Sequence, residues 1–184
     1  CGASDVFIAG DANDDVPVLH EAADEGRIAG ANAARWPQIQ PGARRTPLAI
    51  VFSEPNIAVA GRRHADLADT PIIEGGIDFA RQGRARAGQR NHGLMRLYAE
   101  PETGKLLGAE MCAPAAEHMA HLLALALDRG MTVRELLRLP FYHPVLEEGL
   151  RSALRELAAQ LPAAGESDLN SCGSFEGIGA EALE

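Results

Sequence analysis

The stretch LMRLYAEPETGKLLGAEM, residues 94–111, decides the fold. Its two apolar runs, 94–99 and 106–111, flank the segment Pro101-Glu102-Thr103-Gly104-Lys105, whose proline and glycine are typical of a turn. The pattern predicts a β-hairpin. Shorter apolar runs upstream, at 48–52, 57–60 and 72–80, predict three more strands. Residues 46–110 are therefore predicted to form a strand-rich unit.

Three helices are predicted after these strands. The first covers 115–129 and ends at Gly130, and the second follows Thr132, because Thr132-Val133-Arg134-Glu135 fits a capping box. The third is predicted to begin at Pro144, since proline is favoured in the first turn of a helix, and its apolar residues continue at spacings of three and four to Leu161. Strands followed by helices indicate an α+β fold, in which helices cover an antiparallel sheet.

The N-terminal part has a different pattern. Residues 4–10 are predicted to be a short buried strand with Asp11 at its carboxyl end, where α/β folds often meet a ligand's hydroxyl groups. A helix from Pro17 to about Ala34 follows, and then a linker at 35–45 with two prolines and a glycine. We expect three regions: 1–45, the sheet-and-helix domain at 46–161, and a disordered tail at 162–184, rich in Gly, Ser, Ala and Glu.

Composition limits the classes of partner. The net charge of −9 argues against nucleic acid or an anionic membrane as the main partner. No apolar run reaches the roughly 18–20 residues that span a bilayer, and no secretory signal is visible. The three cysteines are far apart and form no CxxC or CxxxxC pair, which is typical of a reducing, cytoplasmic setting.

The segment Phe141-Tyr142-His143-Pro144-Val145-Leu146-Glu147-Glu148 holds the candidate catalytic residues. A carboxylate that contacts a histidine orients the ring, selects its tautomer and favours its charged form, which makes a proton-transfer base. Periodicity does not choose between Glu147 and Glu148 as the partner of His143. The alternative is that His143 only caps the helix, with solvated acids nearby.

Three other patterns have simpler interpretations. His118 and His121, beside Glu117, lack a further ligand that would complete a metal site, so surface histidines are the better interpretation and no metal is predicted. The basic run 81–90 has no interleaved aromatic residues and is interpreted as a solvated strand edge. Cys112 is interpreted as a core thiol.

Four blocks in order resemble the C-terminal part of the pyridine nucleotide–disulfide oxidoreductases, and most closely the dihydrolipoamide dehydrogenase branch. VFIAGD (6–11) with LHEAADEG (19–26) resembles the second flavin-binding motif and the helix after it. VFSEPNIAVAG (51–61) and RARAGQRNHGLMRLYAEPETGKLLGAEMCAP (84–114) resemble strands of the interface domain. HPVLEEGL (143–150) resembles the His-Pro catalytic motif. The match covers roughly residues 4–160.

The resemblance implies a role for each block. His143 would be the acid–base residue, and Glu148, five residues on, would orient it. Gly10 and Asp11 would belong to the FAD site, with Asp11 bonded to the ribityl chain, and the helix start at Val18, Leu19 and His20 would face the flavin ring. The partners implied are a second copy, joined through 46–161 so that His143 serves the other subunit, and a lipoyl-bearing protein or small disulfide. NAD would be the second cofactor.

Motifs that the family also uses are not found in this sequence. It contains no GxGxxG for FAD or NAD and no redox CxxxxC pair, which the resemblance would place upstream of Cys1. We therefore expect this polypeptide alone to be inactive, with only a partial FAD site. Glutathione-reductase-like enzymes share the His-Pro motif and remain an alternative. A mercuric-reductase-like enzyme is a weaker alternative, because Cys172 is the only cysteine near the C-terminus. A dimerisation module without catalysis is the third.

Overall fold

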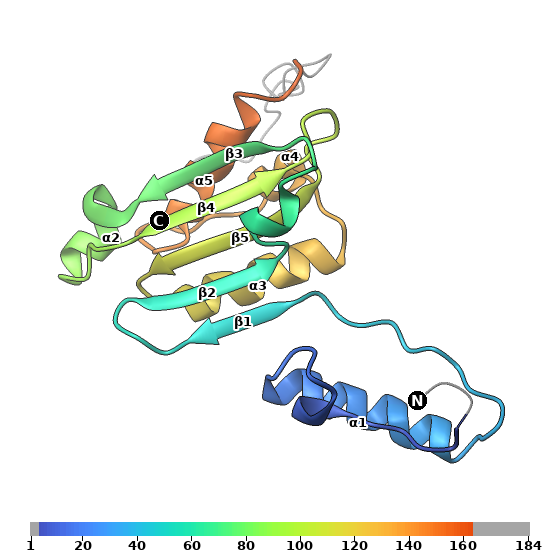
Figure 1. The fold of residues 1–184 in the computed structure, drawn as a ribbon. Helices are drawn as coiled ribbons and strands as arrows, with labels where there is room; N and C mark the ends of the chain where they lie inside the picture. Colours follow the sequence, from blue (N-terminus) through green and yellow to red (C-terminus); the bar gives the residue numbers. More distant parts are fainter. Residues whose placement is uncertain (1–3, 164–184) are drawn as a thin grey trace, which may run out of the picture.

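The structure, a computed structural model, describes residues 4–163, and these contain one five-stranded antiparallel sheet (Figure 1). Its strand order is β1-β2-β5-β4-β3. The strands are β1 (Leu48–Val51), β2 (Asn56–Gly61), β3 (Ile73–Asp78), β4 (Leu94–Ala99) and β5 (Leu106–Ala113). Helices cover the sheet, so the α+β prediction and the hairpin of residues 94–111 are confirmed. The tail predicted for 162–184 lies almost wholly outside the described residues.

Alternation along the strands determines which side chains enter the core. Met95 and Leu97 of β4 pair with Met111 and Ala109 of β5, and all four are almost completely buried. Leu94, the neighbour of Met95, points to the opposite face, as does Ile57 of β2, and both side chains are about half exposed. One face of the sheet is therefore packed and the other is largely open, as is common in antiparallel sheets.

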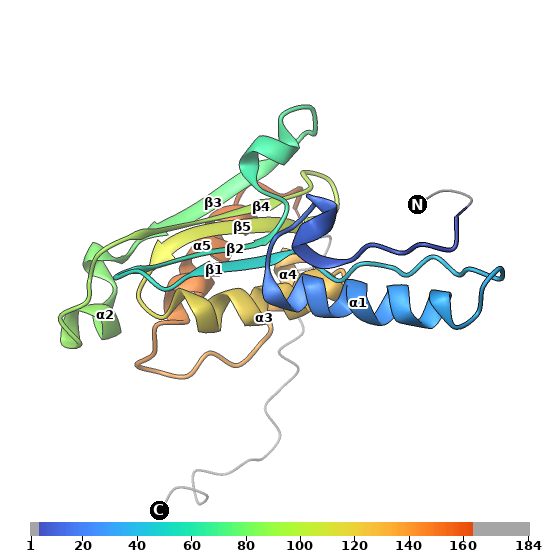
Figure 2. The same ribbon diagram turned by 60° about the horizontal axis from the view of Figure 1, so that its bottom comes forward.

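The packed face is covered by α3 (Ala116–Asp128), α4 (Val133–Leu137) and α5 (Glu148–Ala158) (Figure 2). Helix α3 lies against β1, β2 and β5, whereas α5 lies against β3 and β4. Helix α4 begins with the predicted capping box: the Glu135 N–H donates to the Thr132 hydroxyl at 3.2 Å, and the Thr132 N–H donates to the Glu135 carboxylate at 2.7 Å. Helix α4 therefore starts at the position that Thr132 and Glu135 predict.

Helix α5 approaches β3 closely because a glycine lies beneath it. A Cβ at Gly75 would stand 2.5 Å from the Ala153 carbonyl oxygen and 2.8 Å from the Leu157 Cγ. At the start of the same helix, a Cβ at Gly149 would stand 2.9 Å from the Phe79 ring. The contact at Gly75 brings the middle of α5 close to β3, and the contact at Gly149 places the first turn of α5, which carries Glu148, against Phe79 just after β3.

Two sequence predictions about local structure are wrong. Residues 4–10 form no strand, and Val6 and Ile8 are each more than half exposed, because no described strand pairs with this segment. The basic run 81–90 is not a strand edge. It turns through η3 (Phe79–Arg81) into the short helix α2 (Gly83–Ala87), which starts because the Gln82 side chain accepts the Ala85 N–H at 2.6 Å.

The remaining elements lie toward the N-terminus and on the open face. The turn η1 (Gly10–Asn13) precedes α1 (Leu19–Ala33), and both lie outside the sheet-and-helix layers, joined to β1 by a long connection (Figures 1 and 2). The turn η2 (His64–Leu67) covers part of the open face. Beneath it, burial and a 2.8 Å bond to Glu110 raise the pKa of Tyr98.

Candidate functional site

His143 and Glu148 are in direct contact. The distance from Nδ1 of His143 to Oε1 of Glu148 is 2.9 Å, and the side chains are 80% and 28% exposed. A carboxylate can only accept hydrogen bonds, so this contact requires the ring proton on Nδ1. The other ring nitrogen, Nε2, is then the atom of a neutral His143 that can take up a proton. Glu147 has no side-chain partner among residues 4–163.

The helix that carries Glu148 starts later than the sequence predicts. Helix α5 begins at Glu148 and not at Pro144, and its first i to i−4 bond joins the Arg151 N–H to the Glu147 carbonyl at 3.1 Å. In the segment before the helix, Oε2 of Glu148 accepts the Val145 N–H at 3.2 Å. Residues 144–147 therefore form a turn, and the same carboxylate holds both this turn and His143.

Gln82 anchors this turn from outside, a role that no pattern in the sequence predicted. It is only 7% exposed, and its side-chain N–H donates to the Val145 carbonyl at 2.7 Å. Its oxygen caps α2 at the same time. A lone glutamine in an arginine-rich run gives little signal in sequence, although a polar residue directly before Gly83 at a helix start was a possible indication. Gln82 thus couples the turn at residues 143–147, here called the His143 turn, to α2.

The contact with His143 has an electrostatic consequence for Glu148. The hydrogen bond from His143, followed by the one from the Val145 N–H, holds the pKa of the Glu148 carboxyl below its ordinary value of 4.5. Since this pKa is lower in the folded chain than in the unfolded chain, ionised Glu148 stabilises the fold above the unfolded pKa. That contribution is lost as pH falls through the folded pKa.

We therefore predict that the His143–Glu148 contact survives at neutral pH and opens only below about pH 4.5. A carbon-detected NMR titration of the Glu148 carboxyl should give a midpoint below 4.5. In the His143→Ala variant the midpoint should rise, because the stronger of the two donors is gone. A midpoint that is the same in both proteins would contradict the assignment of His143 as the cause.

The residues that the family resemblance assigns to FAD lie at two places near the start of α1. The Gly10 N–H donates to Oε2 of Glu25 at 2.7 Å, so it is already used inside the protein. Gly10 has φ +72°, and a Cβ there would stand 3.2 Å from the Ala22 Cβ, so glycine is suited to this turn. The Asp11 carboxylate is exposed and has no partner among residues 4–163.

Helix α1 begins without a side-chain cap. Its first backbone bond joins the Ala22 N–H to the Val18 carbonyl at 3.0 Å, which leaves the N–H groups of Leu19 and His20 without an acceptor among the described residues. Val18, Leu19 and His20 line one side of a groove of about 900 Å³, and residues of β1 and α3 line the other. Leu19 is 87% exposed.

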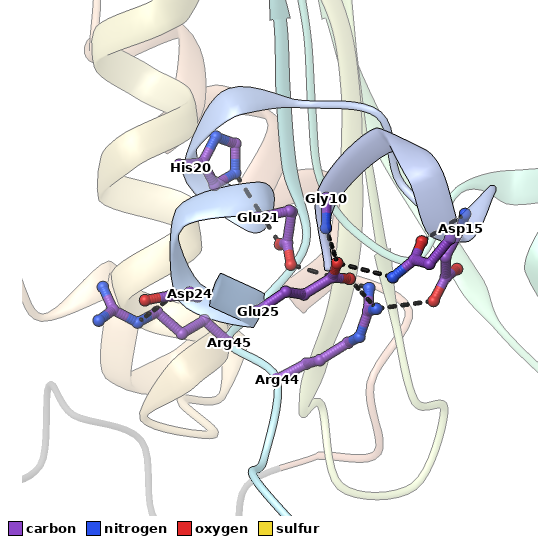
Figure 3. A network of polar contacts seen from close by, with 9 residues as sticks. Gly10, Asp15, His20, Glu21, Asp24, Glu25, Arg44 and Arg45 are labelled. Carbon is purple, nitrogen blue, oxygen red and sulfur yellow. Dashed lines mark hydrogen bonds and ion pairs between the residues drawn. The ribbon is translucent and has the colours of Figure 1, made fainter. Parts of the chain in front are cut away.

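A network of ion pairs joins the linker to α1 and to the Gly10 turn (Figure 3). The Arg44 guanidinium contacts Asp15 at 2.7 Å and Glu21 at 3.8 Å, and it also bonds to Glu25. Its neighbour Arg45 pairs with Asp24 at 2.8 Å. Sequence spacing does not reveal this network, because its cations stand 19 or more residues after their partners. It holds the linker residues 44–45 against α1.

The predicted histidine pair does not form a metal centre in the described part of the chain. Residues 4–163 contain no group of three or more His, Cys, Asp or Glu side chains that could hold a metal ion. His121 Nδ1 lies 2.6 Å from the Glu117 carbonyl oxygen, and His118 Nε2 lies 3.6 Å from the Glu117 carboxylate. Within the same residues, no helix is long and apolar enough to cross a membrane.

Comparisons with known sequences identify relatives for most of the chain. Residues 48–154 match the family model described as "Pyridine nucleotide-disulphide oxidoreductase, dimerisation domain". The chain is 31% identical over 159 residues to a dihydrolipoyl dehydrogenase of Haloferax volcanii, covering 84% of this chain and 33% of that protein. It is 29% identical over 165 residues to an NAD(P)H dehydrogenase (quinone) of Mycobacterium tuberculosis, covering 85% and 32%. It thus spans about a third of the length of these curated relatives.

Solved structures have the same fold. LpdA from Mycobacterium tuberculosis superimposes with a TM-score of 0.69 and 26% identity, covering 81% of this chain and 33% of that chain. The HOCl-induced flavoprotein disulfide reductase RclA from Escherichia coli also has a TM-score of 0.69, at 19% identity, covering 80% and 34%. The second comparison bears on the fold alone.

Proposed function

Because this chain belongs to the pyridine nucleotide–disulphide oxidoreductase family, a family of flavin-dependent enzymes, we propose that it supplies the acid–base pair and the dimer interface of a disulfide oxidoreductase. The observation that carries the proposal is the 2.9 Å contact between His143 and Glu148, in a turn whose histidine is 80% exposed. A histidine that only caps a helix needs no carboxylate on its ring. An exposed, oriented imidazole is suited to exchange protons with a bound thiol.

In the proposed reaction the dithiol substrate loses two protons and an electron pair. FAD, when bound, would supply the redox chemistry by which the electron pair and one of the two protons reach NAD as a hydride. Nε2 of His143 takes a proton from the substrate thiol, and the carboxylate of Glu148 stabilises the imidazolium that forms. Gln82 and the Val145 N–H keep the turn in place while the ring changes charge.

The residues present fit part of an FAD site. Asp11 offers an unpartnered carboxylate that suits a hydroxyl group, and the start of α1 offers free N–H groups and a positive dipole end. Val18, Leu19 and His20 would lie against the flavin along the groove that they line. The proposed role of Gly10 is to allow the turn before Asp11. Its N–H is not available to the cofactor, because it already donates to Glu25.

We propose a homodimer formed through the sheet-and-helix domain of residues 46–161. The open face of the sheet exposes apolar residues of β2 and β4, such as Ile57 and Leu94, and a dimer would remove them from water. The match to a dimerisation domain supports this assignment. In such a dimer His143 would serve the disulfide and flavin of the other subunit.

Dihydrolipoamide is the substrate that we favour, with NAD as its oxidant and a lipoyl-bearing protein as the natural partner. The resemblance of residues 84–114 and the names of several relatives support it. A glutathione-reductase-like enzyme remains the alternative, because both branches use the His-Pro motif. A quinone reductase is a second alternative, since a relative with that name matches at similar identity.

The test is a substrate comparison with the complete enzyme. We expect the highest kcat/KM for dihydrolipoamide with NAD, a lower value for glutathione disulfide with NADPH, and the lowest for a quinone with NADH. The 184-residue chain alone should show no turnover, because it has no redox cysteine pair. Preferential turnover of glutathione disulfide or quinone would overturn the substrate assignment, and turnover by the chain alone would overturn the proposed division of labour.

A further inference from the structure

Four arginines gather on the surface beside the His143 turn. Arg81, Arg84, Arg86 and Arg90, here called the arginine patch, stand within ten residues that contain no acid. The other 174 residues hold 13 Lys and Arg against 26 Asp and Glu. The patch is therefore a local positive region on a chain that is otherwise strongly acidic. Such segregation of charge creates a local field that attracts an oppositely charged partner.

The positive charge of the patch is not compensated internally. All four arginines are exposed, and none forms an ion pair with an acid among residues 4–163. Elsewhere on the chain Arg44, Arg45 and Arg63 each pair with a carboxylate, whereas Arg35, Arg129 and Arg155 also form no ion pair among residues 4–163. The patch is therefore distinguished by holding four such charges within ten residues. The patch thus keeps its full charge available to another molecule.

The patch is fixed in space relative to His143. Gln82 lies between Arg81 and Arg84, is buried, and donates to the Val145 carbonyl at 2.7 Å. Arg84 and Arg90 line a hollow of about 430 Å³ together with Leu146, which follows His143 by three residues. A molecule held on the patch therefore lies against the turn that carries the proposed acid–base residue.

We propose that the arginine patch is the docking surface for an acidic protein segment that carries the disulfide substrate to His143; this inference rests on the proposed function. The charges are spread over a turn and a short helix and do not converge on one point, which fits an extended acidic surface better than a single small anion. The run also lacks aromatic residues on which nucleic-acid bases would stack, which disfavours single-stranded nucleic acid.

Charges at such a site act mainly on the rate of association and on its dependence on salt. At about 0.15 M ionic strength the Debye length is about 8 Å, so attraction between exposed charges falls as salt is added. Binding through the patch is therefore expected to weaken strongly with salt, whereas contacts of the lipoyl group itself should not.

The experiment uses the isotope-labelled 184-residue chain and three synthetic probes. The first is a peptide with a lipoyl-lysine flanked by Asp and Glu, the second has Asn and Gln in place of the acids, and the third is the acidic peptide without the lipoyl group. NMR titrations at low and at physiological salt report the affinity and the residues that shift. We expect the acidic lipoyl peptide to bind about tenfold more tightly than its amide counterpart at low salt.

A matched pair of variants locates the effect. Arg84→Gln, Arg86→Gln and Arg90→Gln together should abolish the advantage of the acidic peptides. The control, Arg35→Gln, Arg129→Gln and Arg155→Gln, removes the same charge from exposed arginines elsewhere and should retain most of it. Equal losses in the two triple variants would overturn the proposal, as would equal affinity for the acidic and amide peptides or tighter binding of an oligonucleotide of equal charge.

Two further measurements distinguish docking of an acidic segment from an interface between two copies of the chain and from a failure of the proposed function. Sedimentation should give the same oligomeric state for the wild-type chain and the patch variant; a change would assign the arginines to an interface between copies and overturn docking. The His143 ring signals should shift clearly more with the acidic lipoyl peptide than with its lipoyl-free form. If the patch binds acids but the His143 ring never responds, the docking role fails, whereas failure of the proposed function shows separately as missing dihydrolipoamide turnover.

Discussion

Replacing His143 with glutamine is expected to lower the rate of dihydrolipoamide oxidation by the complete enzyme about 10²-fold or more. Glutamine keeps a similar length and can still donate to Glu148, so the turn at residues 144–147 should remain. It cannot take up a proton near neutral pH, however, so the proton-transfer step is lost while the geometry is kept. Steady-state measurement of NAD reduction, normalised to bound flavin, reports the effect.

The two neighbouring glutamates supply the controls. Glu148→Gln should slow the reaction less than His143→Gln, because the ring keeps a neutral acceptor but loses the charge that stabilises the imidazolium. Glu147→Gln, one residue away, should have the smallest effect, since its side chain has no described partner. An unchanged rate in His143→Gln would remove His143 from the mechanism, and the reverse order of the two glutamates would show that the wrong carboxylate had been assigned.

The largest effect on stability is expected from Leu154→Ala, in the helix that carries Glu148. Leu154 is fully buried in the core between α5 and the sheet. Truncating a buried leucine removes apolar contact and leaves a cavity, which costs about 2–5 kcal/mol of the free energy of unfolding. A domain of this size has a total of only about 5–15 kcal/mol, so the midpoint of denaturant unfolding should fall clearly.

A matched variant in the same helix tests the cause. Arg155→Ala changes the next residue, which is exposed, and should alter the free energy of unfolding by no more than about 0.5 kcal/mol. Both substitutions place alanine in α5, so helix propensity changes little in either variant. The difference between their free energies of unfolding therefore reports the burial of Leu154. A loss below about 1 kcal/mol for Leu154→Ala would show that α5 is not packed as described. In Leu154→Ala, the hydrogen bond between His143 and Glu148, followed by NMR, should also weaken.

Local patterns predicted much of the sheet-and-helix unit. The strands around Met95 and Met111 follow from alternation, because every second side chain of a strand points to the same face. Thr132 and Glu135 predicted the start of α4, since both partners of the capping box lie within four residues. Such features depend only on residues that are close in sequence, so they can be predicted from the sequence alone.

Other features depended on groups that are distant in sequence. Residues 4–10 have the composition of a strand but lack a pairing partner, and Pro144 is a good helix starter whose turn is instead held by the side chain of Glu148. Gln82 reaches Val145 across 63 residues, and Arg44 reaches three acids near α1. No regular spacing of residues in the sequence predicts either of these contacts.

The sequence by itself therefore determined the α+β class, the order of the strands and helices in the chain, the absence of a redox cysteine pair, and a histidine with two nearby carboxylates as a candidate pair. The family resemblance already pointed to Glu148, and the structure brings it into contact with His143. Only the tertiary structure decided that the helix begins at Glu148 and that Gln82 joins the arginine patch to the His143 turn. The physical reason is range: alternation and capping act within a few residues, whereas these contacts require α5, β3 and α2 to pack together first.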